Sequence, residues 1–216
     1  MRTMTATTLS FEHVGEIVAV LSDAFHDYPV MRHVLGPAHP YDVRLHRLVQ
    51  LFVSGRAYRN DPLLGLRDDA GTLVGAAVMT RPREEGPPPV FIALRESIWA
   101  ELGAETRARY HAYAAATQRV AIAAPHHHLN MIGVRRSHQG LGLARVLLDA
   151  VHDLASADDQ SAGVSLTTEG PENVALYEHF GYRVEGHARV APDLETWTMF
   201  RAARGESQGA ASDRHR

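Results

Sequence analysis

The sequence predicts an α/β (α+β) fold with helices flanking a central sheet, and three observations support this. Segments with apolar residues at helical spacing are interspersed with short segments rich in apolar and β-branched residues. Two of the short segments are joined by residues 68–71, Asp-Asp-Ala-Gly, which is a hairpin turn signal. Residues 131–148 begin as an apolar run, pass through a basic turn and a Gly-x-Gly, and continue as an amphipathic helix.

The composition is that of an ordinary globular protein. The 216 residues are ample for a sizeable core, and 45% of them are hydrophobic and 22% charged. The net charge of -3 argues against general nucleic-acid binding. The absence of cysteine excludes a disulfide framework, thiolate metal ligands and a cysteine acyl-enzyme, and fits a reducing compartment. We see neither a secretory signal nor an apolar run of membrane-spanning length, so we expect a cytoplasmic protein without nucleic-acid or membrane partners.

We expect a single domain over residues 1–202. Residues 203–216 are polar and contain glycine and serine, so they are predicted to form a disordered tail.

The first half of the chain is predicted to begin with helices and a hairpin. The expected elements are a short edge strand at 5–9, helices at 14–25 and 41–58, hairpin strands at 63–67 and 72–80, and a helical region at 94–123 that Gly103 divides. The first helix ends by Tyr28, because Pro29 disfavours helical dihedrals in the residue before it. Residues 81–89 are charged and proline-rich, and form a candidate rim for a binding site.

The second half is predicted to continue from a central strand that ends near Val134. The later elements are helices at 143–155 and 172–180, a strand at 163–168, and two final strands at 182–186 and 196–201. Pro171 near the start of the second helix and Gly181 after it are typical helix boundaries.

Three adjacent histidines, His126, His127 and His128, precede the central strand and raise the question of a metal site. Neighbouring strand residues point to opposite faces, so at most His126 and His128 share one face. We find no acidic or histidine partner at zinc-ligand spacing, and predict no metal.

The Gly-x-Gly segment predicts an anion site. Glycines remove side chains where a ligand approaches the backbone, and the first amides of a helix are free donors that favour a phosphate. No Gly-Lys-Ser/Thr follows, which excludes a P-loop, and Arg145 occupies the place of the third glycine of a dinucleotide fingerprint. A turn that merely starts a helix is the alternative.

The stretch Gln139-Gly140-Leu141-Gly142-Leu143-Ala144 resembles the acyl-CoA loop of the GCN5-related N-acetyltransferases (GNAT), whose pattern is Arg/Gln-x-x-Gly-x-Gly/Ala. Asn173, Tyr177, Gly181 and Tyr182 resemble the second hallmark of that family, Asn-x-x-x-x-Tyr-x-x-x-Gly-Phe/Tyr, although the first interval is one residue shorter here. The match is good over residues 129–201, whereas earlier residues match only in the order of elements.

The resemblance implies a GNAT-type mixed, mostly antiparallel sheet whose central strands splay apart. Pantetheine would lie in the gap and bond to the first of these strands at Ile132, Gly133 and Val134. The backbone of residues 139–144, namely Gln139, Gly140, Leu141, Gly142, Leu143 and Ala144, would bind the pyrophosphate. Asn173 is either a cofactor ligand or a helix-cap residue, and these alternatives stay open.

The resemblance also implies catalytic roles. An amide near Ile132 would stabilise the oxyanion, and Tyr177 would protonate the leaving thiolate, although Tyr177 could equally be a core residue. The family often uses a Glu or an ordered water near the first strand as the general base, and His128 and Glu169 are the candidates here. The assignment stays open, because Thr167 and Thr168 occupy the place where the family commonly has an acid.

The implied function is transfer of an acetyl group from acetyl-CoA to a small-molecule amine by direct attack in a ternary complex. Tyr28, Phe91 and Trp99 are candidates for lining the acceptor side, although each could instead belong to the core. Acetylation of a protein N-terminus or lysine, and a non-catalytic acyl-CoA-binding module, are the alternatives. Dimers are common in the family, so the resemblance leaves a homodimer open.

Overall fold

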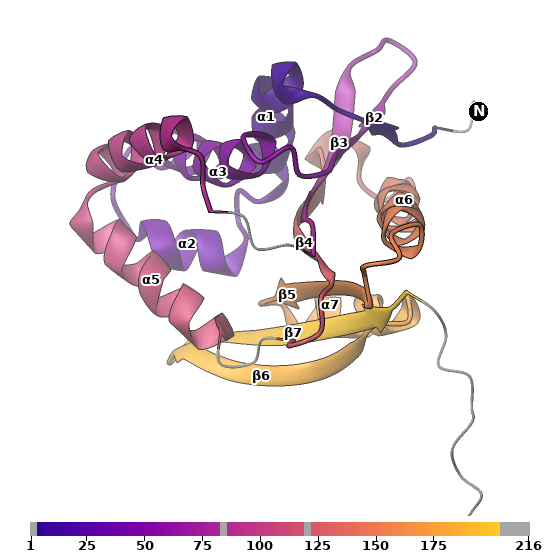
Figure 1. Ribbon diagram of the computed structural model, residues 1–216. Helices are drawn as coiled ribbons and strands as arrows, with labels where there is room; N and C mark the ends of the chain where they lie inside the picture. The colour runs from indigo at the N-terminus through magenta and orange to yellow at the C-terminus, as the bar shows by residue number, and fades with distance from the viewer. Residues whose placement is uncertain (1–3, 83–85, 119–121, 204–216) are drawn as a thin grey trace, which may run out of the picture.

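The described part of the chain is built around one mixed sheet. The computed structural model describes residues 4–82, 86–118 and 122–203. These residues form a seven-stranded sheet of order β1-β2-β3-β4-β5-β7-β6 (Figure 1). Its strands are β1 (Thr7–Thr8), β2 (Leu63–Arg67), β3 (Leu73–Thr80), β4 (His127–Val134), β5 (Gly163–Thr168), β6 (Arg183–Ala191) and β7 (Leu194–Ala202). Neighbouring strands are antiparallel except for β4 and β5, which are parallel.

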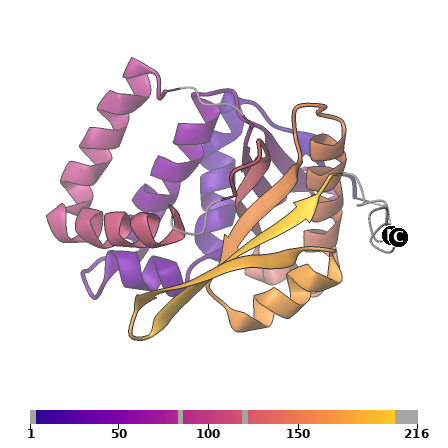
Figure 2. The ribbon, with the colours of Figure 1, turned by 60° about the horizontal axis from the view of Figure 1, so that its bottom comes forward.

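Helices cover the sheet on both faces. They are α1 (Val14–Ala24), α2 (Pro29–Leu35), α3 (Tyr41–Ala57), α4 (Pro89–Leu102), α5 (Ala104–Gln118), α6 (Leu143–Ser156) and α7 (Pro171–His179), with short 3-10 turns at Phe11–His13 and Arg136–His138. Both views place α4 and α5 at one side of the molecule and α6 at the other (Figures 1 and 2). None of the described helices combines the length and the apolar character needed to cross a membrane.

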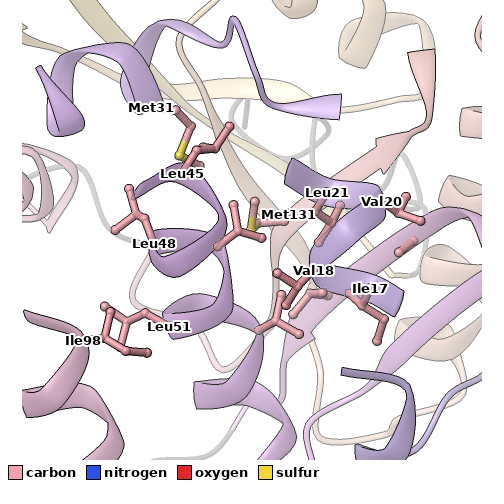
Figure 3. Close-up of a cluster of buried hydrophobic side chains, with 14 of the residues drawn as sticks. Ile17, Val18, Val20, Leu21, Met31, Leu45, Leu48, Leu51, Ile98 and Met131 are labelled. Carbon is pink, nitrogen blue, oxygen red and sulfur yellow. The ribbon is translucent and has the colours of Figure 1, made fainter. Parts of the chain in front are cut away.

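The alternation of side chains along β3 creates two hydrophobic cores. Ala76 and Val78 face a cluster made with α1 to α4, whereas Ala77 and Met79 face a cluster made with α6. Figure 3 shows the first cluster, in which side chains of α1, α2, α3 and α4 gather with Met131 of β4. Helix α6 is strongly amphipathic, and its residues Leu147 and Val151 are fully buried, as the helical spacing of apolar residues predicts.

Beyond a short pairing, β4 and β5 separate. Their register runs only from His127 opposite Val164 to Leu129 opposite Leu166. On the other side of β4, the register with β3 shifts at Asn130, which forms a bulge. Figure 1 shows β2 to β4 running at a steep angle to β5 to β7. The predicted splayed, mostly antiparallel sheet is therefore confirmed.

Most predicted elements occur at or near their expected positions, but one helix was not expected and two element boundaries differ. Strand β6 runs to Ala191, five residues beyond its predicted end at 186. Helix α2 was not expected, because Pro29 was interpreted only as a stop; it is also the first residue of a new helix, a position that proline favours. Helix α4 begins at Pro89 for the same reason, five residues before the predicted start. The end of the predicted helical region at 119–121, part of the predicted loop at 83–85 and the predicted tail at 204–216 lie outside the described residues.

Candidate active site

A large cavity connects the gap between β4 and β5 with the helices on the α1 side of the sheet. Its volume is about 1180 Å³. The predicted site residues that line it are His128, Ile132, Gly133, Val134, Gln139, Ala144, Glu169, Asn173 and Tyr177. Of the remaining four, Gly140, Leu141 and Gly142 lie in the loop before α6, and Leu143 is the first residue of that helix. The structure thus brings residues of β4, α6 and α7, together with Glu169 just after β5, to one space.

The backbone of the glycine loop has the conformation that an anion site needs. Gly140 and Gly142 have φ angles of 77° and 75°, which are unfavourable for other residues, and Gly142 is the N-cap of α6. A Cβ at either position would meet nothing within 4 Å, so the conformation rather than crowding requires glycine. Within the described chain the amides of Leu143 and Ala144 have no hydrogen-bond acceptor, so they remain available to a ligand.

The end of β4 supplies an unpaired backbone edge. Residues 130–134 extend beyond the pairing with β5, so the edge that faces the gap has no neighbouring strand. The Gln139 side chain turns back and donates from Nε2 to the carbonyl oxygen of Val134, 3.2 Å away. Gly133 has a structural role as well, because a Cβ there would lie 2.6 Å from Cβ of Ala24 in α1.

Glu169 follows β5 and is held by hydroxyl groups from distant elements. Its side chain is buried, and its Oε1 accepts hydrogen bonds from the Tyr113 hydroxyl at 2.7 Å and from the Thr196 hydroxyl at 2.9 Å. Its backbone N–H donates to the hydroxyl oxygen of Tyr28 at 3.1 Å. Burial raises the pKa of Glu169, and the hydrogen bonds from Tyr113 and Thr196 oppose that rise.

Tyr177 lies on α7 with its ring against Tyr182, the two centroids 5.6 Å apart. Burial, reinforced by the negative charge of Glu169, raises the pKa of Tyr177 to about 12. Within the described residues its hydroxyl has no hydrogen-bond partner, and the residue lines the cavity. The phenol is therefore protonated at neutral pH and free to donate a proton or a hydrogen bond.

His128 is less suited to accept a proton. Its Nδ1 lies 2.7 Å from the hydroxyl oxygen of Ser165. Burial lowers its pKa to about 4, and the charges of His126 and Arg56 add to that effect. The neighbouring His127 turns to another environment, where its Nδ1 is 3.1 Å from the hydroxyl oxygen of Ser161. In the described ranges no three histidine, cysteine or acidic residues are grouped so that they could hold a metal ion.

Asn173 lies within α7, and its alternative interpretation as the helix cap is wrong. The helix begins at Pro171 with Gly170 as its N-cap, and the backbone N–H of Asn173 already bonds to the carbonyl oxygen of Gly170. The residue is one turn before Tyr177, and both line the cavity.

Sequence reasoning missed Tyr113 and Thr196, the two donors to the Glu169 carboxylate. A tyrosine within an alanine-rich helix was the only signal for Tyr113, and nothing in the sequence distinguishes Thr196 from other strand threonines. Tyr28, Phe91 and Trp99 pack in the hydrophobic core and also line the cavity, and their role on the acceptor side stays a prediction.

Comparisons with known proteins agree with this geometry. The family model described as an acetyltransferase (GNAT) domain matches residues 91–200, more than half of the chain. A structure described as histone acetyltransferase HPA2 and related acetyltransferase, from Corynebacterium glutamicum, is 22% identical, with 92% of this chain and 96% of that chain covered and a TM-score of 0.67.

Two further solved structures share the fold. Arylalkylamine N-acetyltransferase 2 from Aedes aegypti is 15% identical, with 94% of this chain and 100% of that chain covered and a TM-score of 0.65. The ribosomal-protein-S18-alanine N-acetyltransferase from Escherichia coli is 14% identical, with 97% and 100% covered and a TM-score of 0.58. The fold, the arrangement of the two motifs and the family model lead to one conclusion: this chain belongs to the GNAT acetyltransferase family.

Proposed function

We propose that this protein transfers the acetyl group of acetyl-CoA to a primary amine of a small molecule, by direct attack in a ternary complex. The observation that supports this most strongly is that one cavity is lined by Gln139 and Ala144 beside the glycine loop, by Glu169 and Tyr177, and by helices on the α1 side.

The proposed cofactor-binding residues use backbone groups. The amides at the start of α6, beside Gly140, Leu141 and Gly142, would hold the diphosphate, because helix N-termini with free N–H groups favour anions. The free edge of β4 at Ile132, Gly133 and Val134 would bond to the pantetheine amides as a neighbouring strand does. Asn173 would contact the same arm from α7.

Glu169 is the general base in this proposal and Tyr177 the general acid. The raised pKa of Glu169 suits a group that takes a proton from an ammonium at neutral pH. The neutral amine forms the C–N bond at the thioester carbon, a β4 amide near Ile132 stabilises the oxyanion, and the C–S bond then breaks. Tyr177 gives its proton to the leaving sulfur and regains one from the amine nitrogen, so the products are an amide and the free thiol.

The lining of the acceptor end favours a small molecule over a protein tail. The cavity wall there comes from α2, α3, α4 and α5 and is largely apolar and aromatic, including Phe52, Trp99 and Tyr110. Such concave, mostly apolar lining with a few polar groups is typical of small-molecule sites. Among the similar structures, the Aedes aegypti protein is named for arylalkylamines.

The first prediction tests turnover and separates an enzyme from a binding module. We expect wild-type protein to bind coenzyme A and to release thiol from acetyl-CoA when members of a panel of primary amines are added. Tyr177→Phe should lower kcat by about 100-fold or more, because it removes the proton donor, while coenzyme A affinity measured by calorimetry stays within a few-fold.

The Tyr182→Phe variant is the matched control, because Tyr182 contacts Tyr177 and bonds instead to Nε2 of His152. It should keep most of the wild-type kcat. If coenzyme A binds but no amine raises thiol release, the protein is a binding module and the proposed function is wrong.

A further inference from the structure

Two arginines form a cationic wall in the acceptor part of the cavity. Arg56, near the end of α3, and Arg59, just after it, both line the cavity. Arg56 donates from Nη1 to the Thr80 hydroxyl at 2.7 Å, and that hydroxyl donates to Oδ1 of Asn130 in the β4 bulge. The Arg56 guanidinium is thereby fixed beside the central strand.

The charge of this wall is only partly balanced. Asp61 is the nearby carboxylate, but its Oδ2 is 3.5 Å from Nη1 of Arg56, which is an ion pair longer than a hydrogen bond. Its Oδ1 accepts from the backbone N–H of Arg81. Among the described residues, the buried Nε atoms of Arg59 and Arg81 have no hydrogen-bond partner, and neither does Oδ2 of Asp61.

The two arginines also repel each other. Burial lowers the pKa of Arg56, and the positive charge of Arg59 lowers it further, whereas Asp61 acts in the opposite direction. A pair of cations held together in a partly buried site is stabilised when an anion enters.

The other arginines of the cavity differ in this respect. Arg95 and Arg107 share the carboxylate of Glu96, at 3.0 and 2.8 Å, so each donates a hydrogen bond to a carboxylate oxygen. Among the described residues, Arg56 and Arg59 differ from this pair because neither donates a hydrogen bond to a carboxylate.

Arg56 and Glu169 lie at different positions along the strand direction of the sheet. Thr80, which Arg56 contacts, is opposite His128 in β4, and His128 is opposite Ser165 in β5. Ser165 precedes Glu169 by four residues, which corresponds to roughly 13 Å along a strand. A ligand can thus present one end to Glu169 and another to the arginines, with an apolar body against Tyr110, which lines the same cavity.

We propose that the acceptor is an amine that also carries an anionic group, a carboxylate or a phosphate, and that Arg56 and Arg59 bind this group while the amine reaches Glu169. The inference rests on the proposed function, since it names the class of amine. Guanidinium groups suit such an anionic group because they bind carboxylate and phosphate oxygens through paired N–H donors.

The test compares acceptors that differ only in the distal group: 2-phenylethylamine, 4-(2-aminoethyl)benzoate and the phosphate ester of tyramine. We expect at least one anionic acceptor to exceed the neutral one in kcat/KM by roughly tenfold to a hundredfold, chiefly through KM, as hydrogen bonds to charged groups allow. Arg59→Met should remove most of this ratio. The order of the two anionic acceptors shows whether carboxylate or phosphate is preferred.

Arg95→Met is the matched control, because it removes a cavity arginine that is already paired, and it should keep the ratio. Arg59→Glu should invert the preference, so that 4-(aminomethyl)phenethylamine, which carries a second cation, has a higher kcat/KM than the anionic acceptors. Circular dichroism and coenzyme A affinity confirm that each variant is folded. Equal kcat/KM values for neutral and anionic acceptors, or a ratio that survives both Arg59 substitutions, would overturn the inference.

Binding without turnover distinguishes this inference from the proposed function. Calorimetry of 4-(2-aminoethyl)benzoate in the presence of coenzyme A should show binding that Arg59→Met weakens. Such binding without turnover of any amine would support the anion site and refute the proposed function. Turnover of amines without any dependence on Arg59 would support the proposed function and refute the anion site.

Discussion

Glu169 is surrounded by hydroxyl groups from three distant parts of the chain. Tyr28 precedes α2, Tyr113 belongs to α5 and Thr196 to β7. Burial favours the protonated carboxyl, whereas the Tyr113 and Thr196 hydrogen bonds favour the carboxylate. Burial has the larger effect, so the pKa of Glu169 is raised above its ordinary value. The stability gained from a raised carboxyl pKa is present below the ordinary Glu value and is lost as pH rises through the raised value.

We expect Tyr113→Phe to shift the acid limb of the kcat/KM profile to higher pH. The variant loses the hydrogen bond that lowers the pKa of Glu169, so the carboxylate required as base is populated only at higher pH. Kinetics over pH 5 to 9 measure the shift. Tyr110→Phe, on the same helix, is the control and should keep the wild-type limb; a Tyr113→Phe profile that coincides with wild type would argue against Glu169 as the base.

At the scale of single elements, the loop before α6 was predictable and α2 was not. Gly140, Gly142 and the apolar face of α6 form a pattern contained within 18 residues, so local spacing suffices. Helix α2 has only seven residues, and its proline ends one helix and starts another. A pattern search interprets the proline as a boundary but cannot see that Val30, Met31 and Val34 are buried by α3 and α5.

Gly142→Ala should destabilise the fold by about 1 kcal/mol and also weaken coenzyme A binding. The cost in stability arises because φ is 75° there, and the loss of affinity because the amides of α6 would be displaced. Gly71→Ala is the matched control: its φ is 81° and it also has open space, but it lies in the β2–β3 hairpin. Denaturant unfolding should show similar losses for both variants, and calorimetry a loss of affinity for Gly142→Ala alone. Equal coenzyme A affinities would remove the loop from the binding site.

At the scale of the whole molecule, α4 and α5 contribute to the cavity wall, and arginines attach them to the rest of the fold. Arg44 of α3 donates to the Leu102 carbonyl oxygen and the Thr106 hydroxyl, both at 2.8 Å. Arg109 of α5 donates to the carbonyl oxygens of Val34 and Leu35 at the end of α2, at 2.9 and 3.1 Å. These bonds satisfy helix-terminal carbonyl groups and hold α5 against α2.

Arg109→Met should loosen α5 and raise the KM for the acceptor, while coenzyme A affinity stays unchanged. Tyr113 lies one turn after Arg109, so a looser α5 also weakens its bond to Glu169. Hydrogen exchange of residues 104–118 should increase. Arg107→Met is the control, because that side chain bonds to Glu96 rather than to α2, and it should leave exchange near Tyr113 unchanged. Unaltered exchange in Arg109→Met would show that apolar packing alone holds α5.

The parts of the site that the sequence predicts are those that lie close together along the chain. Glu169, Asn173 and Tyr177 fall within nine residues, and the motif relates them to the glycine loop. Tyr113 reaches Glu169 across 56 residues, and Arg56 reaches Thr80 across 24. Such contacts depend on how α3 and α5 pack, which neither periodicity nor motif spacing specifies.

The pairing between β4 and β5 covers only three residues of each strand, and this has a mechanical consequence. Apart from the two-residue pairing of β1 with β2, every other pair of neighbouring strands shares a longer register. The fewest strand–strand hydrogen bonds within the body of the sheet are therefore expected between β4 and β5. Small hinge movements about His127–Leu129 would widen or narrow the cleft without unravelling any strand. A ligand bound in that cleft would link the two parts of the sheet, so binding should reduce the mobility of both β4 and β5.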